Sequence, residues 1–178
     1  FRARAAGYGV EEGKLAIVGF SAGGYLASIS AVTRSMPEFE SACDDKMADK
    51  QRPDIDVAVV WYGIHDFNKL SPMSGNVMDT VLFSKVSDKK SFKKKVSPVT
   101  YAEKAPPMLL LHGTVDSLVP VSQSHEMCDA VKAAGGECKM VEFPNSEHSF
   151  KNVKTGTDDD FKAALAETGE WLDKHFAK

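Results

Sequence analysis

The chain has 178 residues, of which 43% are apolar and 26% charged, and its formal net charge is −3. This length suffices for one domain with its own hydrophobic core but is short for two, so we expect a single domain over 1–178. The mild acidity gives no reason to expect nucleic acid or an anionic membrane as a partner, and no apolar run approaches the roughly 18 residues of a membrane span.

Short apolar runs alternate with helical patterns along the chain. The runs expected to form buried strands are 15–19, 55–61, 108–112 and 138–143. Apolar residues recur at helical spacing within 22–32, 127–134 and 161–176. Gly135-Gly136 predicts the end of the second helix, and Thr157 with Asp160 predicts a capping box at the start of the third. This alternation favours an α/β fold with a mostly parallel sheet between two helical layers.

Residues 66–100 interrupt this alternation and hold five lysines within 89–95. Long connections in compact domains are often functional, so the insertion is a candidate lid over a site. For the lysines themselves, a solvated surface segment is the favoured interpretation over an anionic contact.

The three cysteines, Cys43, Cys128 and Cys138, form neither a metal-ligand pattern nor a dense disulfide framework. Cys128 and Cys138 would meet if their helix and strand packed together, but two buried thiols are the favoured interpretation. The histidines show no spacing typical of a metal site, and we expect neither a metal nor another cofactor.

Gly19-Phe-Ser-Ala-Gly23 matches the nucleophile-elbow pattern G-x-S-x-G and lies between a predicted strand and a predicted helix. A tight, strained turn there would raise the hydroxyl of Ser21 above the sheet. We expect the two flanking glycines to let strand and helix approach without a side-chain clash. The backbone N–H of Ala22, at the helix start, would donate to an oxyanion.

A serine hydroxyl needs a base and an orienting acid to act as a nucleophile near neutral pH. Asp116 follows the third predicted strand, and His148 follows the fourth. The chain order is therefore Ser, Asp, His, which is the order of the α/β-hydrolases. Three such residues in loops at one end of the sheet predict a Ser21–His148–Asp116 catalytic triad.

Other residues compete for these roles. Asp66 follows the second predicted strand and is an alternative acid. His65 also lies on the expected catalytic side, where we interpret it as a pocket or structural residue. His112 precedes a glycine turn and is typical of a packed, hydrogen-bonded histidine. His125 and His175 lie on predicted helices and are expected at the surface or the edge of the core.

Several motifs together resemble the acetyl-esterase and acetylxylan-esterase-like branch of the α/β-hydrolases. They are Gly19–Ala27, Arg52–Asp54, Val96–Tyr101, Ala105–Pro107 and His112–Asp116. The likeness covers nearly the whole chain. It implies hydrolysis of short acyl esters, including acetyl groups on plant polysaccharide or related small esters.

The same resemblance assigns roles to individual residues. It makes Ser21 the nucleophile, Asp116 the acid and His148 the base. It also implies pocket walls from three residues, namely Trp61, Tyr62 and Val119.

The chain departs from the family pattern at its start, because it begins just ahead of the elbow strand. The resemblance therefore implies that the first strands of the sheet and the preceding oxyanion loop are missing. Loss of one oxyanion donor costs about 2.7–4 kcal/mol in kcat, which predicts a slow enzyme. The apolar strand 15–19 would then be an exposed edge, and we expect a second copy of the chain or an N-terminal piece of the same protein to cover it.

Two other functions stay open. A serine peptidase of the prolyl-oligopeptidase-like group is one, because its elbows also end in Gly-Gly-Tyr, as residues 23–25 do. The other is an inactive fragment or binding protein that keeps the triad as a relic. A purely structural role requires none of the three triad residues, which favours the esterase.

Overall fold

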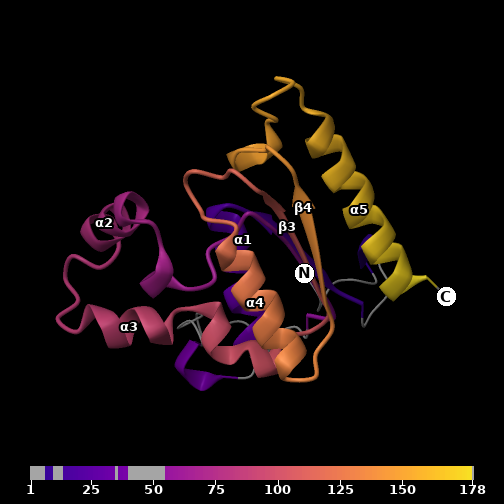
Figure 1. Ribbon diagram of the computed structural model, residues 1–178. Helices are drawn as coiled ribbons and strands as arrows, with labels where there is room; N and C mark the ends of the chain where they lie inside the picture. Colours follow the sequence, from indigo (N-terminus) through magenta and orange to yellow (C-terminus); the bar gives the residue numbers. More distant parts are fainter. Residues whose placement is uncertain (1–6, 10–13, 35, 40–54, 178) are drawn as a thin grey trace.

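A computed structural model describes residues 7–9, 14–34, 36–39 and 55–177. These residues form a sheet of four parallel strands whose spatial order follows the chain order (Figure 1). The strands are β1 (Ala16–Phe20), β2 (Val57–Trp61), β3 (Met108–Gly113) and β4 (Cys138–Phe143). Each lies within two residues of its predicted range, so the strand predictions are confirmed.

Helices cover both faces of the sheet, which confirms the three-layer α/β fold (Figure 1). The helices are α1 (Ala22–Val32) and α4 (Ser122–Ala133) on one face and α5 (Asp159–Phe176) on the other. On β2, Ala58 and Val60 point to the first face, whereas Val57 and Val59 point to α5. Burial on both faces explains why β2 and β3 are continuous apolar runs in the sequence.

The 66–100 insertion extends from one side of the sheet (Figure 1). It consists of η3 (Phe67–Lys69), α2 (Pro72–Val81) and α3 (Lys89–Lys95), followed by η4 (Pro98–Lys104). Phe67 and Phe83 are buried with Ile64 and Val119 in a small separate cluster. Both α2 and α3 are fully described, and neither contributes a buried residue. The insertion is thus anchored at its base, and its role as a lid stays a prediction.

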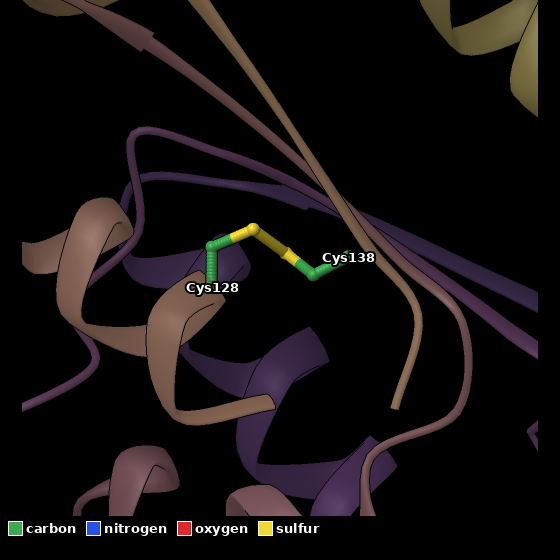
Figure 2. The surroundings of a disulfide bond; sticks show 2 residues. All are labelled: Cys128 and Cys138. Atoms are coloured by element: carbon green, nitrogen blue, oxygen red, sulfur yellow. A yellow bond between two sulfur atoms is a disulfide. The ribbon is translucent and has the colours of Figure 1, made fainter. Parts of the chain in front are cut away.

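The expectation of two buried thiols is wrong. Cys128 on α4 and Cys138 at the start of β4 form a disulfide (Figure 2). Their Cα atoms lie 5.4 Å apart, because α4 packs directly over the strand that follows it. That separation is within the range that a disulfide spans. Cys43 lies outside the described residues.

The end of α4 is as predicted, but the start of α5 is not. Gly135 has a φ of +83° just after α4 and stops the helix. The residue that precedes α5 is Asp158, and no side chain caps the helix there. Asp160 instead accepts hydrogen bonds from Ser146 and Asn152 in the loop after β4. The predicted capping box is wrong because this loop takes up the carboxylate.

Candidate active site

Ser21 lies in the turn between β1 and α1, with a φ of +54° and a ψ of −123°. This conformation is unusual for a residue with a side chain and is typical of functional sites. The turn is held by the backbone N–H of Ser21, which donates to the carbonyl of Trp61 on the adjacent strand. Serine in this position ordinarily caps its helix, yet the Ser21 side chain makes no capping hydrogen bond. Its hydroxyl is therefore available for another partner.

The two glycines of the elbow, Gly19 and Gly23, differ in the space available for a side chain. A Cβ atom on Gly19 would lie 2.2 Å from the carbonyl oxygen of Gly23, so the strand and helix cannot approach with any side chain there. A Cβ atom on Gly23 would meet no atom within 4 Å, which contradicts the expectation that both positions need to be small. The second close approach is instead between Gly24 on α1 and Gly63 after β2.

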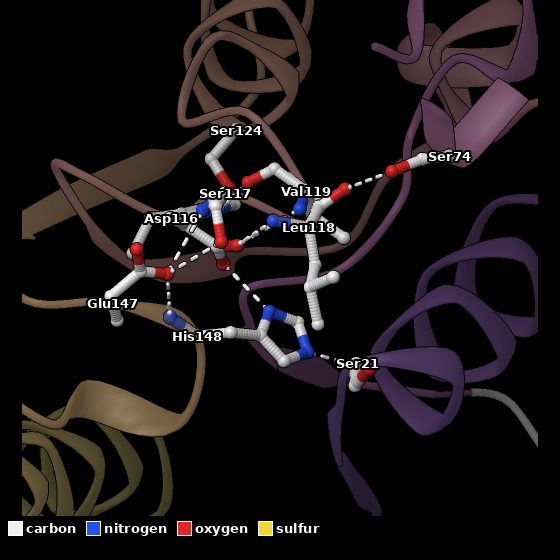
Figure 3. Close-up of polar contacts among 10 residues, drawn as sticks. Ser21, Ser74, Asp116, Ser117, Leu118, Val119, Ser124, Glu147 and His148 are labelled. Carbon is white, nitrogen blue, oxygen red and sulfur yellow. Dashed lines mark hydrogen bonds and ion pairs between the residues drawn. The ribbon is translucent and has the colours of Figure 1, made fainter. Parts of the chain in front are cut away.

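The partner of Ser21 is His148, which is 127 positions further along the chain. The Nε2 atom of His148 lies 2.9 Å from Ser21 Oγ, and its Nδ1 atom lies 2.7 Å from Asp116 Oδ2 (Figure 3). A carboxylate only accepts hydrogen bonds, so Nδ1 carries the proton and Nε2 of the neutral ring accepts from the serine hydroxyl. The structure thus brings the three predicted residues into one hydrogen-bonded series, the Ser–His–Asp group.

The carboxylate of Asp116 is buried, and both of its oxygens accept hydrogen bonds. Its Oδ1 atom accepts from the backbone N–H groups of Leu118 and Val119, each at 2.9 Å. Burial alone raises the pKa of the Asp116 carboxyl, but hydrogen bonds from His112 and His148, joined by a backbone N–H, outweigh it. The pKa of Asp116 is therefore held well below its usual range, and the group is a carboxylate at neutral pH.

Two contacts hold the aspartate loop against the histidine loop. A Cβ atom on Gly113 would lie 2.2 Å from the carbonyl oxygen of Ser146, so the glycine at the end of β3 allows the close approach. Glu147 then accepts hydrogen bonds from the N–H and the hydroxyl of Ser117, at 3.0 and 2.9 Å (Figure 3). Glu147 is not among the residues predicted from the sequence, because only the fold places it opposite Ser117.

The three predicted pocket residues occupy different surroundings. Tyr62 has a φ of +39°, and its ring lies 4.6 Å from the His148 ring, measured between centroids. The indole of Trp61 points to α5, where it donates to the Thr168 hydroxyl. Val119 is buried in the cluster that anchors the insertion. A contact with substrate stays a prediction for all three, and Tyr62 is the one whose ring contacts the Ser–His–Asp group.

The remaining candidates have hydrogen-bond partners other than Ser21. His65 and His112 are fully buried, and His65 is hydrogen-bonded to Ser28 at 3.1 Å. His125 is paired with Glu142 at the surface. Asp66 caps η3 by accepting from the N–H of Asn68. The histidine of the Ser–His–Asp group is thus His148 and the carboxylate is Asp116.

No described group of three or more histidine, cysteine, aspartate or glutamate side chains is placed to hold a metal ion. Within the same part of the chain, every helix is too short or too polar to cross a membrane.

A strained serine between a parallel strand and a helix, with histidine and aspartate on later loops of the same sheet, defines an α/β-hydrolase. Comparison with known proteins identifies a family within this class. The BD-FAE family model matches residues 1–131, which is most of the chain, and the chain belongs to this family. The match includes Ser21 and Asp116 and ends before His148.

Individual relatives agree with this assignment. The chain is 32% identical over 151 residues to the probable carboxylic ester hydrolase LipM of Mycobacterium tuberculosis, a match that covers 80% of the chain and 34% of LipM. The chain therefore spans about a third of the length of this relative. The propionate-bound structure of esterase Est2 from Thermogutta terrifontis has a TM-score of 0.70 at 26% identity, covering 97% of the chain and 60% of Est2.

A peptidase shares the fold as well. The acylaminoacyl peptidase of Pyrococcus horikoshii has a TM-score of 0.74 at 17% identity. The match covers 99% of the chain and 26% of the peptidase. At this identity the likeness concerns the fold alone.

Proposed function

We propose that the chain carries the catalytic centre of a carboxylic-ester hydrolase, with Ser21 as nucleophile, His148 as general base and Asp116 as the orienting acid. The observation that carries the proposal is the continuous hydrogen-bonded series from Ser21 Oγ through the His148 ring to the Asp116 carboxylate. The strained φ of Ser21 and its unused capping position support it, because a structural serine at a helix start needs neither.

In the acylation step, Ser21 Oγ attacks the ester carbonyl carbon while its proton moves to His148 Nε2. Asp116 stabilises the resulting imidazolium through Nδ1. The tetrahedral intermediate then expels the alcohol, which takes the proton from Nε2, and the acyl group remains on Ser21. In deacylation, water gives a proton to Nε2 and attacks the acyl carbon, and Ser21 leaves with that proton as the carboxylic acid is released.

The developing oxyanion needs hydrogen-bond donors. The N–H of Ala22 is in the first turn of α1, where backbone N–H groups have no intrahelical acceptor, and the positive end of the helix dipole lies there as well. We assign Ala22 as one donor. A second donor is required for full activity and would come from another part of the protein.

We propose short, acetyl-type acyl groups as the substrate class, on a small alcohol or a carbohydrate. The acetyl-esterase-like motifs of the sequence support this choice. The relative Est2 was solved with propionate, a short carboxylic acid, which also supports it.

Covalent labelling tests the proposal directly. A fluorophosphonate probe should attach to Ser21, and the chain should hydrolyse p-nitrophenyl acetate. The Ser21→Ala variant should lose both signals, whereas Ser91→Ala, which removes a hydroxyl from α3, should keep both. Peptide mapping that places no adduct on Ser21 in the folded chain would contradict the assignment and favour an inactive fragment or a binding protein.

A serine peptidase is the second candidate. The specific observation in its favour is a 35% identity over 80 residues with the uncharacterized peptidase YuxL of Bacillus subtilis. The same chemistry would then cleave an amide bond. Hydrolysis of a blocked peptide anilide by a chain that leaves p-nitrophenyl acetate intact would favour the peptidase over the esterase.

A further inference from the structure

His112, at the end of β3, is fully buried and is connected to the Ser–His–Asp group from the side opposite His148. Its Nε2 atom lies 2.8 Å from the carbonyl oxygen of Val119 and 3.3 Å from Asp116 Oδ2. Its Nδ1 atom lies 2.7 Å from Ser124 Oγ on α4. Figure 3 shows Ser124 and His148 on opposite sides of the aspartate loop.

These contacts fix the protonation pattern of the ring. A carbonyl oxygen and a carboxylate only accept hydrogen bonds, so Nε2 of His112 must carry a proton whatever the charge of the ring. In the neutral ring, Nδ1 then accepts from the hydroxyl of Ser124. The ring therefore presents an N–H group to the oxygen of Asp116 that also faces His148.

We propose that His112, oriented by Ser124, is a positioning residue that holds the Asp116 carboxylate in place for His148. The inference rests on the proposed function. His112 does not touch the reacting atoms; it acts through Asp116, and through Val119 it fixes the far end of the same loop. Ser124 supplies the hydrogen bond that keeps the ring from rotating.

His112 and His148 share one oxygen of Asp116, and this determines what the removal of His112 would change. Asp116 Oδ2 faces N–H groups from two histidines, so loss of one leaves more negative charge for the other. The imidazolium of His148 would be stabilised more strongly, and the pKa of His148 would rise. The other titratable groups that interact with Asp116 are Tyr62 and Glu147, and His65 interacts electrostatically with His112. All three are kept in the variants that test His112.

The experiment compares His112→Leu with His112→Gln, whose amide keeps an N–H group near the position of Nε2. The rate of fluorophosphonate labelling and kcat/KM for p-nitrophenyl acetate are measured across the acid limb of the pH profile. His112→Leu should lower both rates about 10-fold or more and should move the acid midpoint about half a pH unit upward. His112→Gln should restore most of the rate and most of the midpoint.

A buried histidine that does not contact Asp116 provides the matched control. His65→Leu removes a ring of equal size and burial, and the acid midpoint should stay at the wild-type value. Ser124→Ala is the milder variant should His112→Leu fail to fold, and it should move the midpoint in the same direction by a smaller amount. A rate that falls equally at every pH in His112→Leu, with no gain in His112→Gln, would overturn the inference.

A separate measurement distinguishes this inference from the proposed function. The ring nitrogens of His148 are titrated by NMR in the wild type and in His112→Leu, without any substrate. An upward shift of the His148 pKa in His112→Leu, together with labelling of Ser21 in the wild type, supports both proposals. The same shift, with a wild type that is not labelled, supports the positioning role and contradicts the esterase. An unchanged pKa contradicts the positioning role alone.

Discussion

At the scale of single residues, His65 couples the stability of the fold to pH. Its ring is fully buried, and its Nε2 atom has no hydrogen-bond partner among the described residues. Burial, with a smaller contribution from His112, lowers the pKa of His65 to about 3. An unfolded chain would bind a proton at this histidine near its ordinary pKa of about 6.5, so the two states differ in bound protons between these values.

Above about pH 6.5 His65 is neutral in both states, and the stability of the neutral buried ring is fully present. As the pH falls toward 3 the unfolded chain alone binds the proton, and His65 lowers the free energy of unfolding by up to about 1.4 kcal/mol per pH unit. His65→Asn, which keeps a partner for Ser28, should flatten this dependence in urea unfolding from about pH 4.5 to 7.5. Equal slopes in the two proteins would sink the prediction.

The sequence locates the three residues of the Ser–His–Asp group because each follows a predicted strand, and parallel strands bring such positions to one edge. Sequence order does not show how side chains meet within the core. His112 is only four positions before Asp116, yet its proposed role depends on Ser124 from helix α4. Trp61 and Tyr62 are neighbours with the same predicted role, and both rings pack against Phe150. The Tyr62 ring also contacts His148, whereas the Trp61 indole donates to Thr168, and sequence order does not show this difference.

At the scale of elements, the close packing of β1 against α1 predicts different effects of alanine at the two elbow glycines. Gly23 serves as the control for Gly19. Gly19→Ala would place a Cβ atom 2.2 Å from the Gly23 carbonyl and should destabilise the fold by about 1–3 kcal/mol. Gly23→Ala meets open space in a helix and should change the stability by no more than about 1 kcal/mol. The midpoints of urea unfolding measure both.

An equal loss of stability in the two variants would contradict this prediction. A stable Gly23→Ala would indicate that the glycine at 23 is kept for a reason other than packing, such as room for substrate beside Ser21. Labelling of Gly23→Ala by the fluorophosphonate probe tests that reason. A stable but unlabelled Gly23→Ala would indicate that the added methyl group blocks the serine rather than the fold.

The strands were predictable where hydrophobic patterning alone determines them. Continuous apolar runs mark β2 and β3 because helices cover both of their faces. The contacts between elements were not predictable in this way. The disulfide between Cys128 and Cys138 depends on α4 lying over the start of β4, and the loss of the capping box depends on the loop that takes Asp160. Both are consequences of packing, which spacing in the sequence does not encode.

At the scale of the whole molecule, the outer edge of β1 carries exposed apolar side chains. β1 pairs with β2 on one side, and within the described ranges no strand pairs with its other side. Val18 is 49% exposed and Phe20 is 62% exposed, whereas β2 and β3 are buried along their length. An apolar edge strand with free backbone groups is a site for pairing with another chain.

We therefore propose that copies of this chain associate through β1, and we expect the average mass in light scattering to rise with concentration. Val18→Lys places a charge on the edge without touching Ser21 and should keep the chain monomeric. Val153→Lys is the control, because Val153 is 58% exposed on the loop after β4, and it should associate as the wild type does. A wild-type chain that stays monomeric at every concentration, or one whose association is unchanged by Val18→Lys, would show that the β1 edge does not join copies of the chain.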